Sequence, residues 1–157
     1  MANFIHLRIH SGYSFDDSTL RLKEYILKDT KGTIVQQINS ISQKAKEYQM
    51  SSLALTDKNN IFGGLEHFLE CQNQQINPII GCDITIYDEI LATKTQLLLL
   101  VQNYQGYKNL STLLSKGYEN DDFYITKELL KQYNQGLIAL SGFNTGDIAW
   151  ALSLIHI

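Results

Sequence analysis

Short apolar runs and longer amphipathic stretches alternate along most of the chain. The apolar runs predict strands, and "SLAL", "LLLLV" and "LIAL" are apolar throughout, as is typical of strands covered on both faces. Polar and apolar residues alternate near the N-terminus, which also predicts a strand. The predicted strands are 3–10, 51–57, 77–88, 96–103 and 136–142.

Between these runs, apolar residues recur at helical spacing. One stripe in segment 33–48 consists of Ile34, Ile38, Ile41 and Ala45. The next predicted helix, 59–75, has Asn59 or Asn60 as its candidate N-cap. The apolar side of this second helix carries Phe62, Leu65, Phe68 and Leu69. Further helices are predicted over 104–118, over 125–135 and from about Thr145, and the charged segment 16–31 predicts a helix or an inserted loop.

Alternating strands and helices predict an α/β fold with a parallel sheet, either open or closed into a barrel. In such folds the functional side chains gather at the C-terminal ends of the strands. The candidates at those ends are His10, Asp57, Lys58, Asp83 and the loop after Gly142.

Length and composition narrow the choice of protein class. The 157 residues suit one domain, and 44% of them are hydrophobic, enough for a core. The net charge of −3 and the lack of a basic patch argue against a protein that binds nucleic acid by itself. Cys71 and Cys82 lack metal-type spacing and are expected to be reduced thiols, partly in the core. No signal peptide is recognised and the longest apolar run is 97–101, so we expect a soluble, cytoplasmic protein.

The stretch "HLRIHSGYS" raises the question of a metal or phosphate site. His6, Arg8 and His10 occupy alternate positions and therefore one face of the predicted strand. His6 and His10 would lie roughly 13 Å apart at about 3.3 Å per residue, too far to chelate one ion. Arg8, which has no lone pair, stands where a third ligand would be expected.

Several blocks of the sequence resemble one known family. In order they are "FIHLRIHSGYS", "LALTDKNNIFGGLEHF", "INPIIGCDITI", "LLLLVQNYQGYKNLSTLLSKGY" and "GLIALSG". They are similar to the PHP (polymerase and histidinol phosphatase) domain at the N-terminus of the alpha subunit of bacterial DNA polymerase III. The run from Gly106-Tyr107-x-Asn109-Leu110 to Ser115-x-x-Tyr118 favours this polymerase branch over the free-standing phosphatases.

The resemblance implies a distorted, TIM-like βα barrel, here truncated at the C-terminus. It covers residues 1–152 as an incomplete PHP domain, with an insertion at about 20–32. The apolar tail 153–157 is expected to be a truncation point or foreign sequence, because a domain rarely ends on an uncovered apolar run.

Active members of the family hold a cluster of metal ions and hydrolyse phosphoesters, and the resemblance maps their ligand positions onto this chain. The first His-x-His pair falls on Arg8 and His10, and a family aspartate falls on Asp17. The Thr-Asp-His motif becomes Thr56-Asp57-Lys58. The next carboxylate is Asp83, and Gln96 stands at the place of a further histidine.

Three imidazole positions have therefore become Arg8, Lys58 and Gln96, with His6 beside the vestigial site. Two cations about 4 Å apart repel by about 4 kcal/mol at an effective dielectric near 20, which opposes metal binding. We therefore expect no metal and no other cofactor in this fragment, and no catalytic residue in it. Arg8 and Lys58 are instead hypothesised to pair with Asp17, Asp57 or Asp83.

The resemblance implies an N-terminal fragment of a DNA-directed DNA polymerase, a nucleotidyltransferase of DNA replication, that is inactive by itself. The parent's Mg²⁺ ions belong to its palm domain. The implied partners are the other domains of the alpha subunit, a proofreading exonuclease subunit and, through the parent, primer-template DNA, with no membrane. The alternative is a metal-dependent phosphoesterase or 3′–5′ exonuclease that uses His10, Asp17, Asp57 and Asp83.

The remaining histidines and tyrosines have ordinary interpretations. His67 is expected to be a residue of a helix face, and His156 in the tail is given no role. Tyr104, Tyr107 and Tyr118 could stack on bases. Their helical spacing favours packing instead.

Overall fold

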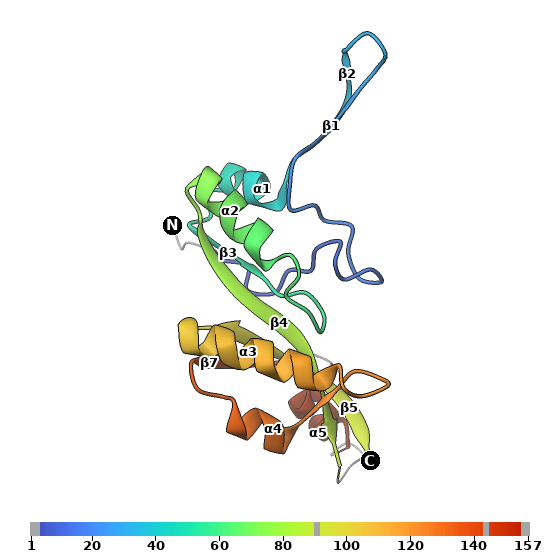
Figure 1. Cartoon of the computed structure of the whole chain (residues 1–157), viewed down its shortest axis with the longest axis vertical. Coiled ribbons are helices and arrows are strands. Elements are labelled where there is room, and N and C mark those ends of the chain that lie inside the picture. Colours follow the sequence, from blue (N-terminus) through green and yellow to red (C-terminus); the bar gives the residue numbers. More distant parts are fainter. Residues whose placement is uncertain (1–3, 90–91, 143–144, 155–157) are drawn as a thin grey trace. The chain divides into compact units, whose positions relative to one another are not determined.

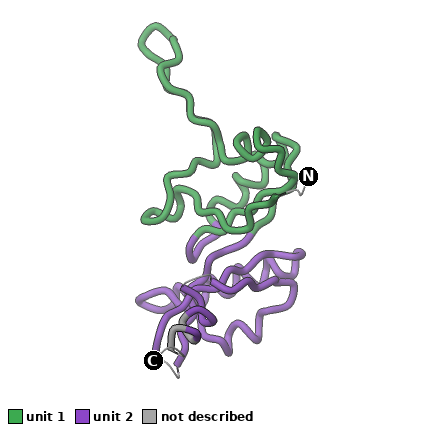
Figure 2. Tube along the Cα trace, turned by 180° about the vertical axis from the view of Figure 1, so that it is seen from behind, with its two compact units in different colours: residues 1–57, 62–80 green, residues 58–61, 81–157 purple. Residues whose placement is uncertain are grey.

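The chain folds into two compact units, and the first is built around a parallel pair of strands. The computed structural model describes residues 4–89, 92–142 and 145–154. The chain divides into a first unit, residues 1–57 and 62–80, and a second unit, residues 58–61 and 81–157 (Figure 2). In the first unit, β3 (Ser52–Leu55) pairs in parallel with the first four residues of β4 (Asn77–Asp88).

Helices α1 (Ile41–Glu47) and α2 (Gly64–Gln74) complete the core of the first unit (Figure 1). Ser40 caps α1 in a capping box with Gln43, whose side chain accepts the Ser40 N–H in return. The buried apolar side chains of this unit are Leu22, Ile41, Ala45, Leu53, Leu55, Cys71 and Ile76.

A hairpin stands where a longer helix was predicted. Strands β1 (Tyr25–Lys28) and β2 (Ile34–Ile38) pair antiparallel, and nearly all their residues are exposed. The prediction of a helix over 33–48 is therefore wrong in its first half, because Ile34 pairs with Lys28 and residues 36–38 pair with residues 25–27 across a turn instead. The insertion predicted at 20–32 remains a prediction, and β1 lies within it.

The N-terminal segment runs alongside β3 but does not form a regular strand. This observation corrects the prediction of a strand over 3–10. The Ala54 N–H donates to the His6 carbonyl at 3.1 Å, and the Thr56 N–H donates to the Ile9 carbonyl at 2.8 Å. The Ile9 N–H donates to Thr56 Oγ1 rather than to a main-chain carbonyl. The Thr56 hydroxyl therefore takes the place of one main-chain acceptor in the hydrogen bonding between this segment and β3.

The second unit is a small sheet with helices packed on it. Its core consists of Cys82, Ile84, Ile86, Leu99, Leu110, Leu113, Leu114 and Ile125. The strands are the remainder of β4, β5 (Thr93–Val101), β6 (Ile125–Thr126) and β7 (Leu137–Ser141). The helices are α3 (Tyr104–Gly117), α4 (Lys127–Gln132) and α5 (Asp147–Leu154) (Figure 1).

Strand direction in the second unit corrects the predicted all-parallel sheet. β5 is antiparallel to both β4 and β7, whereas β6 is parallel to β4. The chain between β4 and β5 is too short for a crossover, so the two strands must run in opposite directions. The mixed α/β class is confirmed, whereas no barrel closure is seen among the described residues. Residues 155–157 of the predicted tail, His156 included, lie outside them.

Helix α2 turns its apolar side away from the core of the first unit. Its buried residues are His67 and Cys71, whereas Leu65 is 72% exposed and Leu69 49% exposed. Neither predicted N-cap begins this helix: its N-cap is Gly63, which has no room for a side chain, because an added Cβ would lie 2.6 Å from a Leu22 methyl. The helical period was predicted correctly, but the side of the helix that faces the core was not.

Candidate functional site

The buried carboxylate of Asp57 organises the loop that follows the N-terminal segment. One carboxylate oxygen accepts the Ser11 N–H at 2.6 Å and the Ser14 hydroxyl at 2.7 Å, and the other accepts the Ser11 hydroxyl at 2.8 Å. Asp57, Ser11 and Ser14 are all buried. Both carboxylate oxygens of Asp57, a predicted site residue, therefore already accept hydrogen bonds from serines that lie 46 and 43 positions earlier in the chain.

The other predicted residues of the first unit lie nearer the surface. His10 Nδ1 lies 3.7 Å from a carboxylate oxygen of Asp17, so the structure brings these two together. Arg8 is exposed. His6 packs edge-on against Phe4, with ring centroids 4.6 Å apart, as expected if it is not a partner of His10.

Lys58, Asp83 and Gln96 belong to the second unit. Lys58 and Asp83 form a parallel backbone bridge, and the neighbouring Asn59 N–H donates to the Asp83 carbonyl at 3.0 Å. Asp83 is fully buried. Gln96 Oε1 accepts the hydroxyl of Thr145, from the loop after Gly142, at 3.0 Å.

Lys58 and Gln96 line the same cavity of the second unit, of about 350 Å³. Asn59 is held at its wall by two bonds with Thr85: its Oδ1 accepts the Thr85 N–H at 2.8 Å, and its Nδ2 donates to the Thr85 hydroxyl at 3.0 Å. Lys94 supplies a second ammonium group to the lining. Two predicted ligand positions therefore line a cavity whose wall also includes Lys94 and its ion-pair partner Asp122.

The side chains at the predicted positions do not fit a metal cluster. Protonated Arg8 and Lys58 offer no lone pair, and the oxygens of Asp57 already accept three hydrogen bonds. Over 4–89, 92–142 and 145–154, no three His, Cys, Asp or Glu residues are placed to hold an ion. The absence of metal nevertheless remains a prediction, to be checked by metal analysis.

Sequence reasoning missed the serines that bind Asp57. Ser11 and Ser14 are three residues apart in the loop after His10, but that spacing does not point to Asp57, which lies 46 and 43 positions later. It also missed an ion cluster in the second unit, where the Lys127 ammonium lies 2.6 Å from Asp88 and 2.8 Å from Asp147. The hydrogen bond to Asp147 is the main reason why the pKa of Lys127 is raised.

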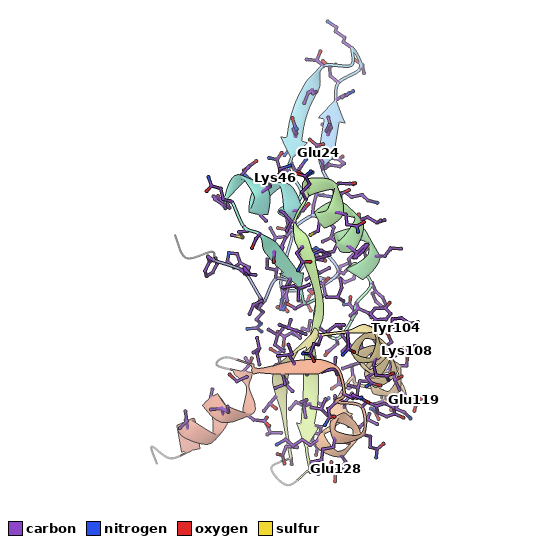
Figure 3. All side chains as sticks on the ribbon, turned by 90° about the vertical axis from the view of Figure 1, so that its left-hand side faces the viewer. Glu24, Lys46, Tyr104, Lys108, Glu119 and Glu128 are labelled. Atoms are coloured by element: carbon purple, nitrogen blue, oxygen red, sulfur yellow. The ribbon has the colours of Figure 1, made fainter. Side chains whose placement is uncertain are left out.

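The exposed tyrosines of α3 do not all pack as predicted. Tyr104 is 72% exposed, and the Lys108 ammonium lies 4.6 Å from the centre of its ring (Figure 3). Tyr118, although 55% exposed, packs edge-on against Phe123. The predicted packing role therefore fits Tyr118 better than it fits Tyr104.

His67 lies on a helix face, as predicted, and that face is the buried one of α2. Its Nε2 lies 3.0 Å from the Leu53 carbonyl, which can only accept, so Nε2 carries the hydrogen. The free lone pair of Nδ1 then faces the Cys71 sulfur at 3.6 Å. Burial lowers the pKa of His67, and this effect outweighs the opposing hydrogen bond to Leu53 and the charge of Asp57.

This geometry predicts a loss of stability in acid. The unfolded chain binds a proton at His67 below about pH 6.5, whereas the folded first unit resists it, so the free energy of unfolding falls as the pH drops from about 6.5 toward the lowered pKa. The steepest slope is about 1.4 kcal/mol per pH unit. Hydrogen exchange of the β3 amides between pH 5 and 8 measures it. His67→Gln keeps a donor for the Leu53 carbonyl and should flatten the profile; an unchanged slope would contradict the assignment.

Comparison with known proteins places this chain in one family. The chain belongs to the PHP domain family, which matches residues 6–155. Its relatives include DNA polymerase III alpha subunits. That of Chlamydia muridarum is 36% identical over 160 residues, and that of Vibrio cholerae is 34% identical over 154. These alignments cover 94% and 95% of this chain, but in each case only 12% of the relative.

Solved structures support the fold. An amidohydrolase from Chromobacterium violaceum superimposes with a TM-score of 0.53 and 19% identity, over 75% of this chain and 34% of that one. No helix among the described residues is long and apolar enough to cross a membrane.

Proposed function

We propose that this chain is the N-terminal PHP domain of a DNA polymerase III alpha subunit, a longer nucleotidyltransferase that replicates DNA in the cytoplasm. The observation that carries the proposal is the identity of 36% to such a subunit over 94% of this chain. Since the chain spans only 12% of that relative, the polymerising carboxylates and their Mg²⁺ ions would lie in later domains. Later residues would also complete the distorted barrel.

Within the parent, we propose a structural role for this domain. It would pack on the polymerase core, dock a separate proofreading exonuclease subunit and reach primer-template DNA only through the parent. The hydrogen-bonded Asp57 and the cations at the former ligand positions favour a metal-free domain that is held together by polar contacts.

Two measurements test this proposal. The full-length product of the reading frame should extend a primer, whereas a frame that ends at Ile157 contradicts the polymerase assignment. The purified 157-residue chain should contain far less than one equivalent of Zn, Mn or Fe by elemental analysis, and EDTA should leave its stability unchanged.

The competing activity is a metal-dependent phosphoesterase. It would appear as hydrolysis of a generic phosphoester with added Mn²⁺, lost in both His10→Ala and Asp83→Ala. About two or three metal equivalents together with this activity would overturn the structural role.

A further inference from the structure

Helix α2 presents an apolar stripe to solvent. Leu65 lies two residues from the buried His67, a rotation of about 200°, so it projects from the opposite side of the helix. Leu69 lies one turn further along that side. Together with Phe62 and Phe68, these residues form what we call the α2 patch. The exposed fractions of the four side chains range from 39% for Phe68 to 72% for Leu65.

The inner side of α2 explains why the apolar side turns outward. His67 must face β3 to reach the Leu53 carbonyl, and Cys71, one turn later, is fully buried. These two contacts fix the rotation of the helix about its axis. The α2 patch is therefore exposed because of how the first unit packs, and large apolar side chains grouped on one side of a helix are typical of an interaction site.

The charges on α2 select among the occupants of the patch. Glu66 and Glu70 lie one turn apart along one flank, and α2 contains no lysine or arginine. Glu66 has an ion pair with Lys23 at 3.3 Å. A second copy would bring two acidic flanks together, and an anionic lipid or nucleic acid would also meet negative charge. A segment with basic flanks is complementary.

The composition of the patch points to a permanent partner. Obligate interfaces are more apolar than transient ones, and the centres of interfaces are depleted of charged residues. The four residues of the α2 patch are all large and apolar. A later part of the proposed parent is the occupant we consider, because this chain spans only 12% of the DNA polymerase III alpha subunit to which it is 36% identical, and the remainder would be joined covalently and always present.

We propose that the α2 patch docks an amphipathic helix from a later part of the parent chain, with an apolar stripe flanked by Lys or Arg. This inference rests on the proposed function, because it requires a parent longer than 157 residues. It adds to that function the surface by which the first unit is held and the chemistry of its partner.

A thiol introduced by Leu65→Cys reports whether the patch is covered. The native thiols give little background in this chain, since Cys71 and Cys82 are fully buried and burial raises the pKa of Cys71 to about 11. Labelling at position 65, followed by peptide mass spectrometry, should be at least 10-fold slower in the full-length polymerase than in the 157-residue chain. Val35→Cys, on the exposed hairpin, is the matched control and should react in the 157-residue chain at a rate similar to that at position 65.

Charge reversal tests the chemistry of the occupant. Adding Glu70→Lys to the full-length Leu65→Cys variant should speed labelling about two- to five-fold, the effect of one partly exposed ion pair. Glu128→Lys, on α4, should leave the rate unchanged (Figure 3).

The outcomes separate this inference from the proposed function. An active full-length polymerase in which position 65 reacts as fast as in the 157-residue chain overturns the docking alone. Protection that requires a second subunit, or that Glu70→Lys leaves unchanged, also overturns it as stated. A reading frame that ends at Ile157 overturns both.

Discussion

Replacing Asp57 by alanine should lower the free energy of unfolding of the first unit by about 3 to 5 kcal/mol. The substitution leaves the Ser11 N–H and the hydroxyls of Ser11 and Ser14 buried without their acceptor. Each buried donor that loses its partner costs about 1 to 3 kcal/mol, and the three share one site, so their costs do not simply add. The loop after His10 would then lose the group that holds it to the end of β3.

Hydrogen exchange measures this loss at two informative amides. The Ala54 and Thr56 N–H groups donate to the His6 and Ile9 carbonyls, so their protection reports directly on attachment of the N-terminal segment. Asp57→Asn keeps one oxygen acceptor and should cost less than Asp57→Ala. Asp16→Ala removes an exposed carboxylate from the same loop and should change the free energy of unfolding by less than about 0.5 kcal/mol. Equal effects of Asp16→Ala and Asp57→Ala would show that the hydrogen bonds to Asp57 contribute little.

Gly106→Ala should destabilise the second unit by about 3 kcal/mol or more. A Cβ at this position would lie 1.8 Å from the carbonyl oxygen of Gly136. The backbone fixes the position of a Cβ and the oxygen belongs to the main chain, so no rotamer change relieves the contact. The same oxygen accepts the Gln102 N–H at 2.9 Å. The added methyl would therefore push the start of α3 away from the turn before β7.

Thermal unfolding followed by circular dichroism, with exchange of the Gln102 amide as a local probe, measures this effect. Gly64→Ala is the matched control, since it also lies in a helix and its added Cβ meets only Ile80 side-chain atoms at 3.9 Å. That control should be neutral or stabilise by up to about 1 kcal/mol, the difference in helix propensity. A Gly106→Ala chain as stable as the Gly64→Ala chain would show that α3 shifts without cost.

The same glycine shows why one motif identified the family so well. Gly106-Tyr107-x-Asn109-Leu110 was recognisable in the sequence because its residue types and spacing are unusual. The structure supplies the cause: Gly106 allows the close approach to Gly136, and the Asn109 side chain donates to the Gln135 carbonyl at 2.8 Å. Leu110 fills the core. The motif thus joins the first turns of α3 to a turn that lies 26 residues later.

The resemblance of several sequence blocks identified the family, and local pattern by itself determined the α/β class and the position of most elements. β4 has its predicted bounds, and α3 ends one residue before its predicted end, because apolar runs and helical repeats are properties of neighbouring residues. The replacement of imidazoles by Arg8, Lys58 and Gln96 was also readable from sequence, through the resemblance. That these replacements abolish metal binding remains a prediction.

Tertiary structure decided what depends on residues far apart. The helical spacing of its apolar residues shows that α2 has an apolar side. The contact of His67 with β3 determined that this side faces outward. The short connection already sets β5 antiparallel to β4, but the pairing of its other edge with β7, which follows α3 and α4 in the chain, required the folded structure. Asp57 is bound by serines 43 and 46 residues away, and a hydrogen bond over that separation leaves no periodic trace in the sequence. Local periodicity thus identified the elements, whereas their rotation, pairing and polar contacts required the folded chain.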